Sequence, residues 1–141
     1  MRTVQFKIPG PVKGKARPRM TKAGIAYTPK ETVQYENLVR MCYKEVAGWY
    51  LEGALSITIV AFFEIPKSTP KYKRQQMIEG KIRYTKKPDW DNIGKIICDS
   101  LNGVAYRDDS QIAMASVFRH YTDGAPYVLV KISELEEGAG G

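Results

Sequence analysis

The stretch ALSITIVAFF at residues 54–63 constrains the fold more than any other part of this sequence. It is rich in β-branched and aromatic residues, and its apolar side chains from Leu55 to Phe63 fall at every second position, as in a strand. Ten residues are too few to cross a membrane, which needs about 20 apolar residues. No other apolar run in the chain approaches that length. The stretch therefore predicts a strand with one face in a hydrophobic core.

Strand-type and helix-type patterns alternate along the rest of the chain. Val4, Phe6 and Ile8 alternate with polar residues and predict a strand. Apolar side chains from Tyr35 to Trp49 recur at helical spacing. Thr-Pro at residues 69–70 is a favourable helix start. We expect strands at residues 3–8, 54–63, 82–87, 111–121 and 127–133, helices at 31–50, 70–80 and 92–102, and a small hairpin around Ala23-Gly24.

Apart from the short strand at 82–87 and the small hairpin, these elements follow the order βαβααββ, in a chain of 141 residues that is near the modal size of one domain. This order predicts a small single domain of the α/β (α+β) class, in which a mixed sheet is flanked by helices. We expect the domain to span residues 1–133. The polar, glycine-rich residues 134–141 predict a flexible tail.

The two cysteines and the single histidine, His120, give no sign of a zinc site. Cys42 and Cys98 form no closely spaced pair and lie in apolar helical patterns, so we expect buried free thiols. The first residues alternate apolar and polar side chains, whereas a signal peptide has a continuous apolar region. With no membrane span either, the sequence predicts a cytoplasmic protein without a membrane partner.

Charge is distributed unevenly along the chain, whose net charge is +7. Residues 1–88 hold 18 Lys and Arg against 6 Asp and Glu, a balance of +12, whereas residues 89–141 hold 4 against 9, a balance of −5. The positive excess indicates a polyanionic partner such as nucleic acid. A metal-dependent nuclease needs carboxylates next to a basic surface. An active site of this kind would explain why residues 89–141 are acidic.

Four aspartates flank the helix expected after Asp91. Asp89 and Asp91 are two residues apart, so in an extended segment their side chains point the same way. Asp108-Asp109 follows the helix, and a returning chain brings this pair back beside the first. Mg²⁺ prefers such oxygen ligands, and a metal held there assists phosphodiester hydrolysis. Lys95, one helical turn from Asp91, adds a positive charge near the phosphate.

Each of these residues also has a structural interpretation. Asp91 suits a helix N-cap, Asp89 a solvated loop, and Asp108-Asp109 a turn. Lys95 pairs readily with a carboxylate one helical turn away. Spacing alone leaves both interpretations open.

The segment PDWDNIGKIICDSLNGVAYRDDSQI, residues 88–112, resembles the signature segment of RusA-type Holliday-junction resolvases, which are common in bacteria and prophages. The shared pattern is D-x-D-N, a Lys three residues after that Asn, a helix with a further Asp, and DD-x-Q-I/V. KARPR at residues 15–19 and YTP at residues 27–29 also resemble prophage members. The helix opened by Thr69-Pro70 resembles their central basic region less specifically. The resemblance covers about residues 3–133.

This resemblance implies a small homodimer that cuts two strands of a four-way junction symmetrically, leaving 5′-phosphate and 3′-hydroxyl ends. It implies that Asp89, Asp91 and Asp109 bind Mg²⁺, with Mn²⁺ as a substitute, and that Lys95 is catalytic. The spacing of the motif does not decide which of the two neighbours, Asp108 or Asp109, is the metal ligand. The expected function is an Mg²⁺-dependent endodeoxyribonuclease that resolves Holliday junctions in DNA recombination and repair.

Two groups of basic residues predict a DNA-binding surface that contacts mostly phosphate. The expected DNA-binding residues are Lys13, Lys15, Arg17 and Arg19 in the first group, and Lys73, Arg74, Lys86 and Lys87 in the second.

A two-fold dimer would match the approximate two-fold symmetry of a four-way junction. The candidates for the dimer interface are Trp49, Tyr50, Phe62 and Phe63, although core packing is the more common use of each.

Three alternatives stay open at this level. A non-catalytic protein that binds branched or single-stranded DNA would share the basic surface. A PD-(D/E)xK nuclease would need an acidic-x-Lys triplet after Asp89, which the sequence lacks. A structural or partner-binding protein would carry its acidic end incidentally.

Overall fold

Strand β4 (Leu55–Glu64), which the ALSITIVAFF stretch predicts, lies inside a four-stranded mixed sheet. In the computed structural model, which describes residues 1–137, the strand order is β1-β6-β4-β5. β6 is antiparallel to both of its neighbours, whereas β4 and β5 are parallel. The other strands of the sheet are β1 (Thr3–Pro9), β5 (Ile112–Thr122) and β6 (Tyr127–Glu134). The predicted α/β (α+β) class with a mixed sheet is confirmed.

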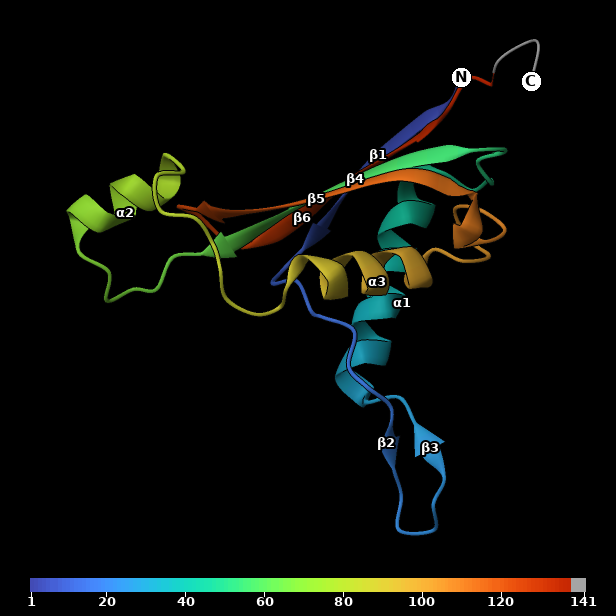
Figure 1. Cartoon of the computed structure of the whole chain (residues 1–141), viewed down its shortest axis with the longest axis horizontal. Helices are drawn as coiled ribbons and strands as arrows, with labels where there is room; N and C mark the ends of the chain where they lie inside the picture. Colours follow the sequence, from blue (N-terminus) through green and yellow to red (C-terminus); the bar gives the residue numbers. More distant parts are fainter. Residues whose placement is uncertain (138–141) are drawn as a thin grey trace.

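Two helices, α1 (Lys30–Val46) and α3 (Trp90–Ser100), cover the same face of this sheet (Figure 1). α1 packs against β1, α3 packs against β5, and the two helices contact each other. The core between the layers follows the sequence pattern, because the inward residues of β4 alternate with outward ones. The predicted apolar face of α3, formed by Ile93, Ile96, Ile97 and Leu101, is fully buried.

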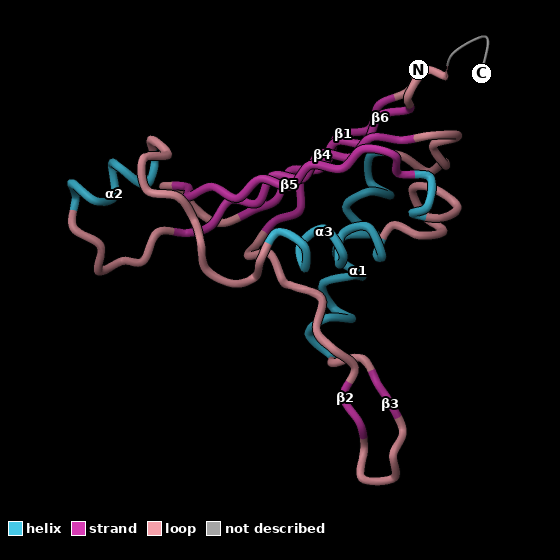
Figure 2. Tube along the Cα trace, viewed as in Figure 1, coloured by secondary structure: helices cyan, strands magenta, loops and turns pink. Residues whose placement is uncertain are grey.

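Two basic segments extend away from this core in different directions (Figures 1 and 2). The short helix α2 (Lys71–Ile78) lies beyond one end of the sheet. The predicted small hairpin, formed by β2 (Arg19–Met20) and β3 (Ala26–Tyr27), projects below the N-terminal end of α1. The start of α3 lies between these two projections.

Two predictions about secondary structure are wrong. The first helix ends at Val46, because Ala47 adopts an extended backbone (φ −153°, ψ 126°) and leads into Gly48. Residues 82–87 do not form a strand. Instead of pairing with a neighbouring strand, Tyr84 stacks on the ring of Phe63, with 3.6 Å between the ring centroids.

The C-terminal part of the described chain continues the sheet through Glu134, and the Leu135 N–H donates to the carbonyl of Ala54 (2.8 Å). Residues 138–141 of the predicted flexible tail lie outside the described residues, so that flexibility stays a prediction. Both cysteines are free, with Cys42 buried and Cys98 half-buried. None of the helices in residues 1–137 has the length and hydrophobicity of a membrane span.

Candidate active site

The first turn of α3 presents two exposed carboxylates to solvent. Asp89 is the N-cap, and its Oδ1 accepts a hydrogen bond from the Asn92 N–H (2.9 Å). Asp91 lies inside the helix, in its first turn. The extended Asp-x-Asp arrangement expected from sequence is therefore wrong, because capping by Asp89 starts the helix at Trp90. The two carboxylates nevertheless belong to the same helix end.

The irregular segment before Asp89 is held in place by two side chains. Arg119 on β5 donates from Nη1 to the carbonyls of Lys86 (2.9 Å) and Pro88 (3.5 Å). The Tyr84 hydroxyl donates to the carbonyl of Lys87, and the Arg119 guanidinium lies over the Tyr84 ring at 5.5 Å. Three consecutive carbonyls are thus fixed immediately before Asp89. Sequence reasoning missed Arg119, although a lone arginine at an inward position of a strand is a usable signal.

Lys95 lies one turn further along α3 and is exposed. Among residues 1–137, no carboxylate lies within ion-pair distance of its ammonium group. The expected surface pair with Asp91 or Asp99 does not form, and Asp99 is instead 3.6 Å from Lys15 Nζ. The Lys95 charge therefore remains available to an anionic ligand near Asp91.

The second aspartate pair divides into two different roles. Asp108 caps the short 3₁₀ turn η1 (Asp109–Gln111) and accepts a hydrogen bond from the Ser110 N–H (3.1 Å). Hydrogen bonding to Ser110 holds the pKa of the Asp108 carboxyl below its usual value. Asp109 is bound twice to Asn102: its N–H donates to Oδ1 (2.8 Å), and its Oδ2 accepts from Nδ2 (3.3 Å).

Asp109 consequently lies at the C-terminal end of α3. Burial raises the pKa of the Cys98 thiol to about 11, and the nearby Asp109 carboxylate adds to this shift. Burial also raises the pKa of Tyr106, with further contributions from Cys98 and Asp109. A helix rises about 1.5 Å per residue, so roughly 18 Å separates the Asp89 cap from the end that holds Asp109.

The predicted return of Asp109 beside Asp89 and Asp91 is therefore wrong within one chain. The loop after α3 stays at the helix end, since Tyr106 donates from its hydroxyl to the Cys98 carbonyl (2.7 Å) and β5 begins there. Within residues 1–137, no three His, Cys, Asp or Glu side chains are placed to hold a metal ion together.

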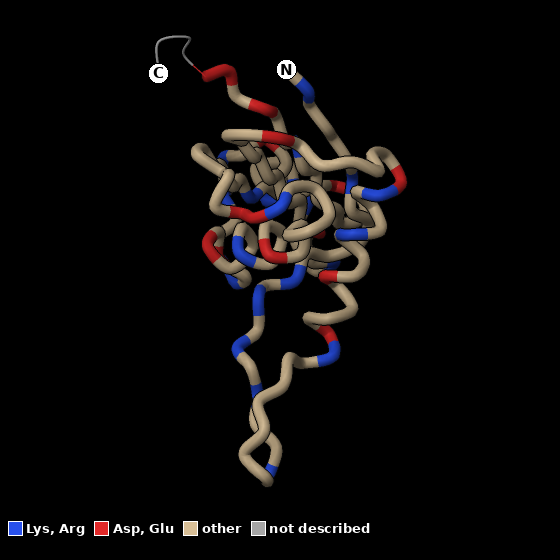
Figure 3. Tube along the Cα trace, turned by 90° about the vertical axis from the view of Figure 1, so that its right-hand side faces the viewer, with Lys and Arg blue, Asp and Glu red and all other residues tan. Residues whose placement is uncertain are grey.

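The expected DNA-binding residues also divide into free and engaged side chains. Lys15 is engaged, because its Nζ lies 2.8 Å from Oε2 of the buried Glu36. Arg74 pairs with Asp123 at 3.2 Å. Figure 3 shows the remaining cations spread along the hairpin and the body. The exposed members of the predicted set are Lys13, Arg17, Arg19, Lys73, Lys86 and Lys87.

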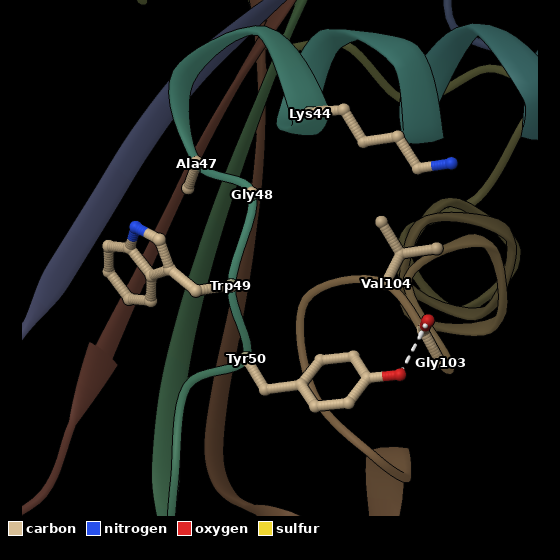
Figure 4. A pocket seen from close by; sticks show the side chains of 7 residues that line it. All are labelled: Lys44, Ala47, Gly48, Trp49, Tyr50, Gly103 and Val104. Atoms are coloured by element: carbon tan, nitrogen blue, oxygen red, sulfur yellow. Dashed lines mark hydrogen bonds between the residues drawn. The ribbon is translucent and has the colours of Figure 1, made fainter.

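A surface cavity of about 440 Å³ opens between the end of α1 and the loop after α3 (Figure 4). Trp49 and Tyr50 line it, and they are 41% and 39% exposed, so neither packs in the core. The Tyr50 hydroxyl donates to the Gly103 carbonyl at 3.0 Å. Of the other interface candidates, Phe63 is buried and Phe62 is half-buried.

Comparison with known proteins gives two matches. The uncharacterized protein YqaN of Bacillus subtilis (strain 168) is 36% identical to this chain over 87 residues, which are 60% of this chain and 61% of YqaN. The chain thus covers less than two thirds of that relative's length. Residues 9–133, which include both ends of α3, the hairpin and α2, match the family described as endodeoxyribonuclease RusA. The chain therefore belongs to the RusA endodeoxyribonuclease family.

Proposed function

We propose that this protein is an Mg²⁺-dependent endonuclease that resolves four-way DNA junctions as a homodimer. The observation that carries the proposal is the exposed first turn of α3, in a chain of the RusA family. Asp89 caps this turn, Asp91 lies one helical turn from Lys95, and Lys95 pairs with no carboxylate of residues 1–137. The exposed Lys86 and Lys87 directly precede this turn and suit contacts with DNA phosphates.

The residues of this turn fit a hard divalent cation. One Asp89 oxygen is used by the helix cap, which leaves its second oxygen and both Asp91 oxygens for a ligand. Mg²⁺ is commonly held by one or two carboxylates together with substrate phosphates, and when bound it supplies positive charge to the phosphate. Lys95 neutralises charge on the phosphate oxygens as water attacks phosphorus. The bond between phosphorus and the 3′-oxygen breaks, and the 3′-oxygen takes up the proton that the attacking water loses, which gives 5′-phosphate and 3′-hydroxyl ends.

A second copy of the chain is the best source of the third carboxylate. β5 pairs with β4 on one side, and no strand of residues 1–137 covers its other edge. A long exposed edge strand presents unpaired N–H and C=O groups to which a strand of another chain can pair. Ala113, Met114 and Ala115 on this edge strand are all exposed, as expected for a surface that a second β5 would cover.

Antiparallel pairing of two β5 strands would bring opposite ends of two α3 helices together. Asp109 lies three residues before the start of β5, whereas Arg119, which holds the segment before Asp89, lies near the end of this strand. In an antiparallel pair the start of one strand lies beside the end of the other. Asp109 of one copy would then approach Asp89 and Asp91 of the second copy, and a two-fold dimer would hold two such sites.

Cleavage of a synthetic four-way junction, with linear duplex and fork controls, tests the proposed function. We expect paired cuts in Mg²⁺ or Mn²⁺, none in EDTA, and products that ligate without further treatment because they carry 5′-phosphates. Junction binding without cleavage in either metal would instead support a non-catalytic branched-DNA binder.

A subunit-mixing experiment tests whether the site is shared. Asp89→Asn and Asp109→Asn proteins should each be inactive alone. In a shared site, a mixed dimer carries both substitutions in one site and none in the other, so random mixing restores about a quarter of the sites. These restored sites nick single strands of the junction. Sites built within one chain would give no recovery, because every copy carries one defect.

A further inference from the structure

The hairpin that projects from the body combines basic side chains with exposed apolar ones. We call residues 17–27 the finger. All of them are exposed, and the chain contains no acidic residue before Glu31. Figure 3 shows the finger as a narrow projection that carries only basic charge. From Arg17 to the turn it is about 20 Å long, at the rise of a strand.

The tip of the finger is apolar on both of its faces. Met20 pairs with Ala26, and these two side chains point to one face. Tyr27 pairs with Arg19 on the opposite face, where Ile25 also lies two residues away. Met20 and Ile25 are 66% and 65% exposed. A hairpin that docked on a flat partner would need only one apolar face, so this arrangement suits insertion between two surfaces.

The tip and the root of the finger are both well defined. At the tip, the Gly24 N–H donates to the Thr21 carbonyl (3.0 Å), with Gly24 at φ +80°, a conformation that glycine adopts readily. At the root, Lys15 binds Glu36 on α1 and also lies near Asp99 on α3. The finger is therefore a preformed projection with an anchored base.

The root also lies against the candidate active site. A Cβ placed on Gly14 would lie 3.0 Å from Pro88 Cβ and 3.4 Å from Asn92 Cβ. Gly14 thus lets the chain pass directly beside the residues that flank Asp89. A nucleic acid held by the finger would consequently extend toward the first turn of α3.

We infer that the finger inserts Met20 and Ile25 between base pairs at the branch point of DNA, while Arg17, Arg19 and Lys22 contact the surrounding phosphates. This inference rests on the proposed function, since it names the part of the junction that the protein recognises. Apolar side chains that enter the base stack must offset the cost of unstacking. That cost is lowest where pairing is already interrupted, so insertion favours a branch over a linear duplex.

Binding measurements without cleavage test this inference. Wild-type protein in EDTA is titrated against a four-way junction and against a linear duplex of the same sequence, each with 2-aminopurine beside the position of the branch. The key variant is Met20→Ser with Ile25→Ser, which leaves every charge in place. Met20→Leu with Ile25→Leu preserves an apolar tip, and Met41→Ser is a matched control, because Met41 is exposed on α1.

We expect the serine variant to lose at least about tenfold in its preference for the junction, because it removes two large apolar side chains and burial of one alone is worth about that factor. Its affinity for linear duplex should stay unchanged. Insertion by the wild-type protein unstacks the base beside the branch and should raise the 2-aminopurine fluorescence of the junction, and this rise should disappear in the serine variant. The leucine variant and Met41→Ser should behave as wild type.

Unchanged preference and fluorescence in the serine variant would overturn the insertion but leave the proposed function intact. A change in oligomeric state of that variant, measured by sedimentation, would also overturn it, since the tip would then contact a second copy. If wild-type protein bound junction and duplex equally, the junction specificity in the proposed function would be wrong, whatever the serine variant did.

Discussion

The two ends of α3 differ in how their carboxylates are held. At the N-terminal end, Asp89 and Asp91 are exposed, and a single backbone hydrogen bond occupies one of their four oxygens. At the C-terminal end, Asp109 is less exposed and is tied to Asn102 by two hydrogen bonds. The carboxylates at the N-terminal end are open to an incoming ligand, whereas the Asp109 carboxylate at the C-terminal end is held in one orientation by Asn102. Substitutions at the two ends should therefore affect the proposed reaction differently.

The largest effect is expected from Asp91→Asn at the open end. The substitution preserves size and removes the charge proposed to hold Mg²⁺, so junction cleavage should fall by at least about 10²–10³-fold. Junction affinity in EDTA should stay the same or rise, because a negative charge near DNA is lost. Glu45→Gln, an exposed site on α1, is the control. Normal cleavage by Asp91→Asn would remove this residue from the mechanism.

Lys95→Ala should have the next largest effect. Loss of one fixed charge at a developing negative charge typically costs about 10²–10³ in rate. The melting temperature should not change, because Lys95 is exposed and pairs with no carboxylate of the described chain. Lys44→Ala on α1 provides the comparison. Single-turnover cleavage within threefold (roughly the range of a surface substitution) would show that Lys95 has no catalytic role.

Asn102→Ala tests the fixed end. It removes both hydrogen bonds to Asp109 and leaves the carboxylate itself in place. Loss of a residue that orients a metal ligand usually costs about 10–100-fold in affinity or activity. We expect the Mg²⁺ concentration for half-maximal cleavage to rise, and cleavage at saturating Mg²⁺ to recover in part. Asn37→Ala, on the exposed surface of α1, should leave both quantities unchanged.

The smallest effect on cleavage is expected from Glu134→Gln, which tests a firmly held carboxylate away from α3. Hydrogen bonds from Arg2 and from the Glu52 N–H lower the pKa of Glu134 to about 2. This stabilisation is present above the unfolded pKa of about 4.3. It is lost as the pH falls through about 2. The melting temperature of wild type at pH 7 should exceed that of Glu134→Gln by a few degrees, and the two should converge in acid.

Cleavage by Glu134→Gln at a temperature well below its melting point should equal that of wild type. A loss comparable to that of Asn102→Ala would contradict the assignment, because a carboxylate that binds Arg2 and Glu52 away from α3 would then take part in cleavage.

The sequence by itself determined the local features of the molecule. The buried face of α3 and the strand β4 follow from spacing, because side-chain direction in a helix or strand depends only on nearby residues. The small hairpin follows from the local turn residues Ala23-Gly24. The exposed positions of Asp91 and Lys95 on α3 follow for the same reason. The family resemblance of residues 88–112 likewise needed no coordinates, and the family match confirms it.

Only the tertiary structure decided which distant residues meet. Asp109 stays at the far end of α3 because the loop after the helix binds back to Cys98 and Asn102. Lys15 is withdrawn from the predicted DNA surface by the buried Glu36, and Arg119 crosses from β5 to hold the segment before Asp89. The contact of Lys15 with Glu36 joins residues 21 positions apart in the chain, and the contact of Arg119 with Lys86 joins residues 33 positions apart. No periodic pattern encodes such distances, since they are set by how the loops pack on the sheet and helices.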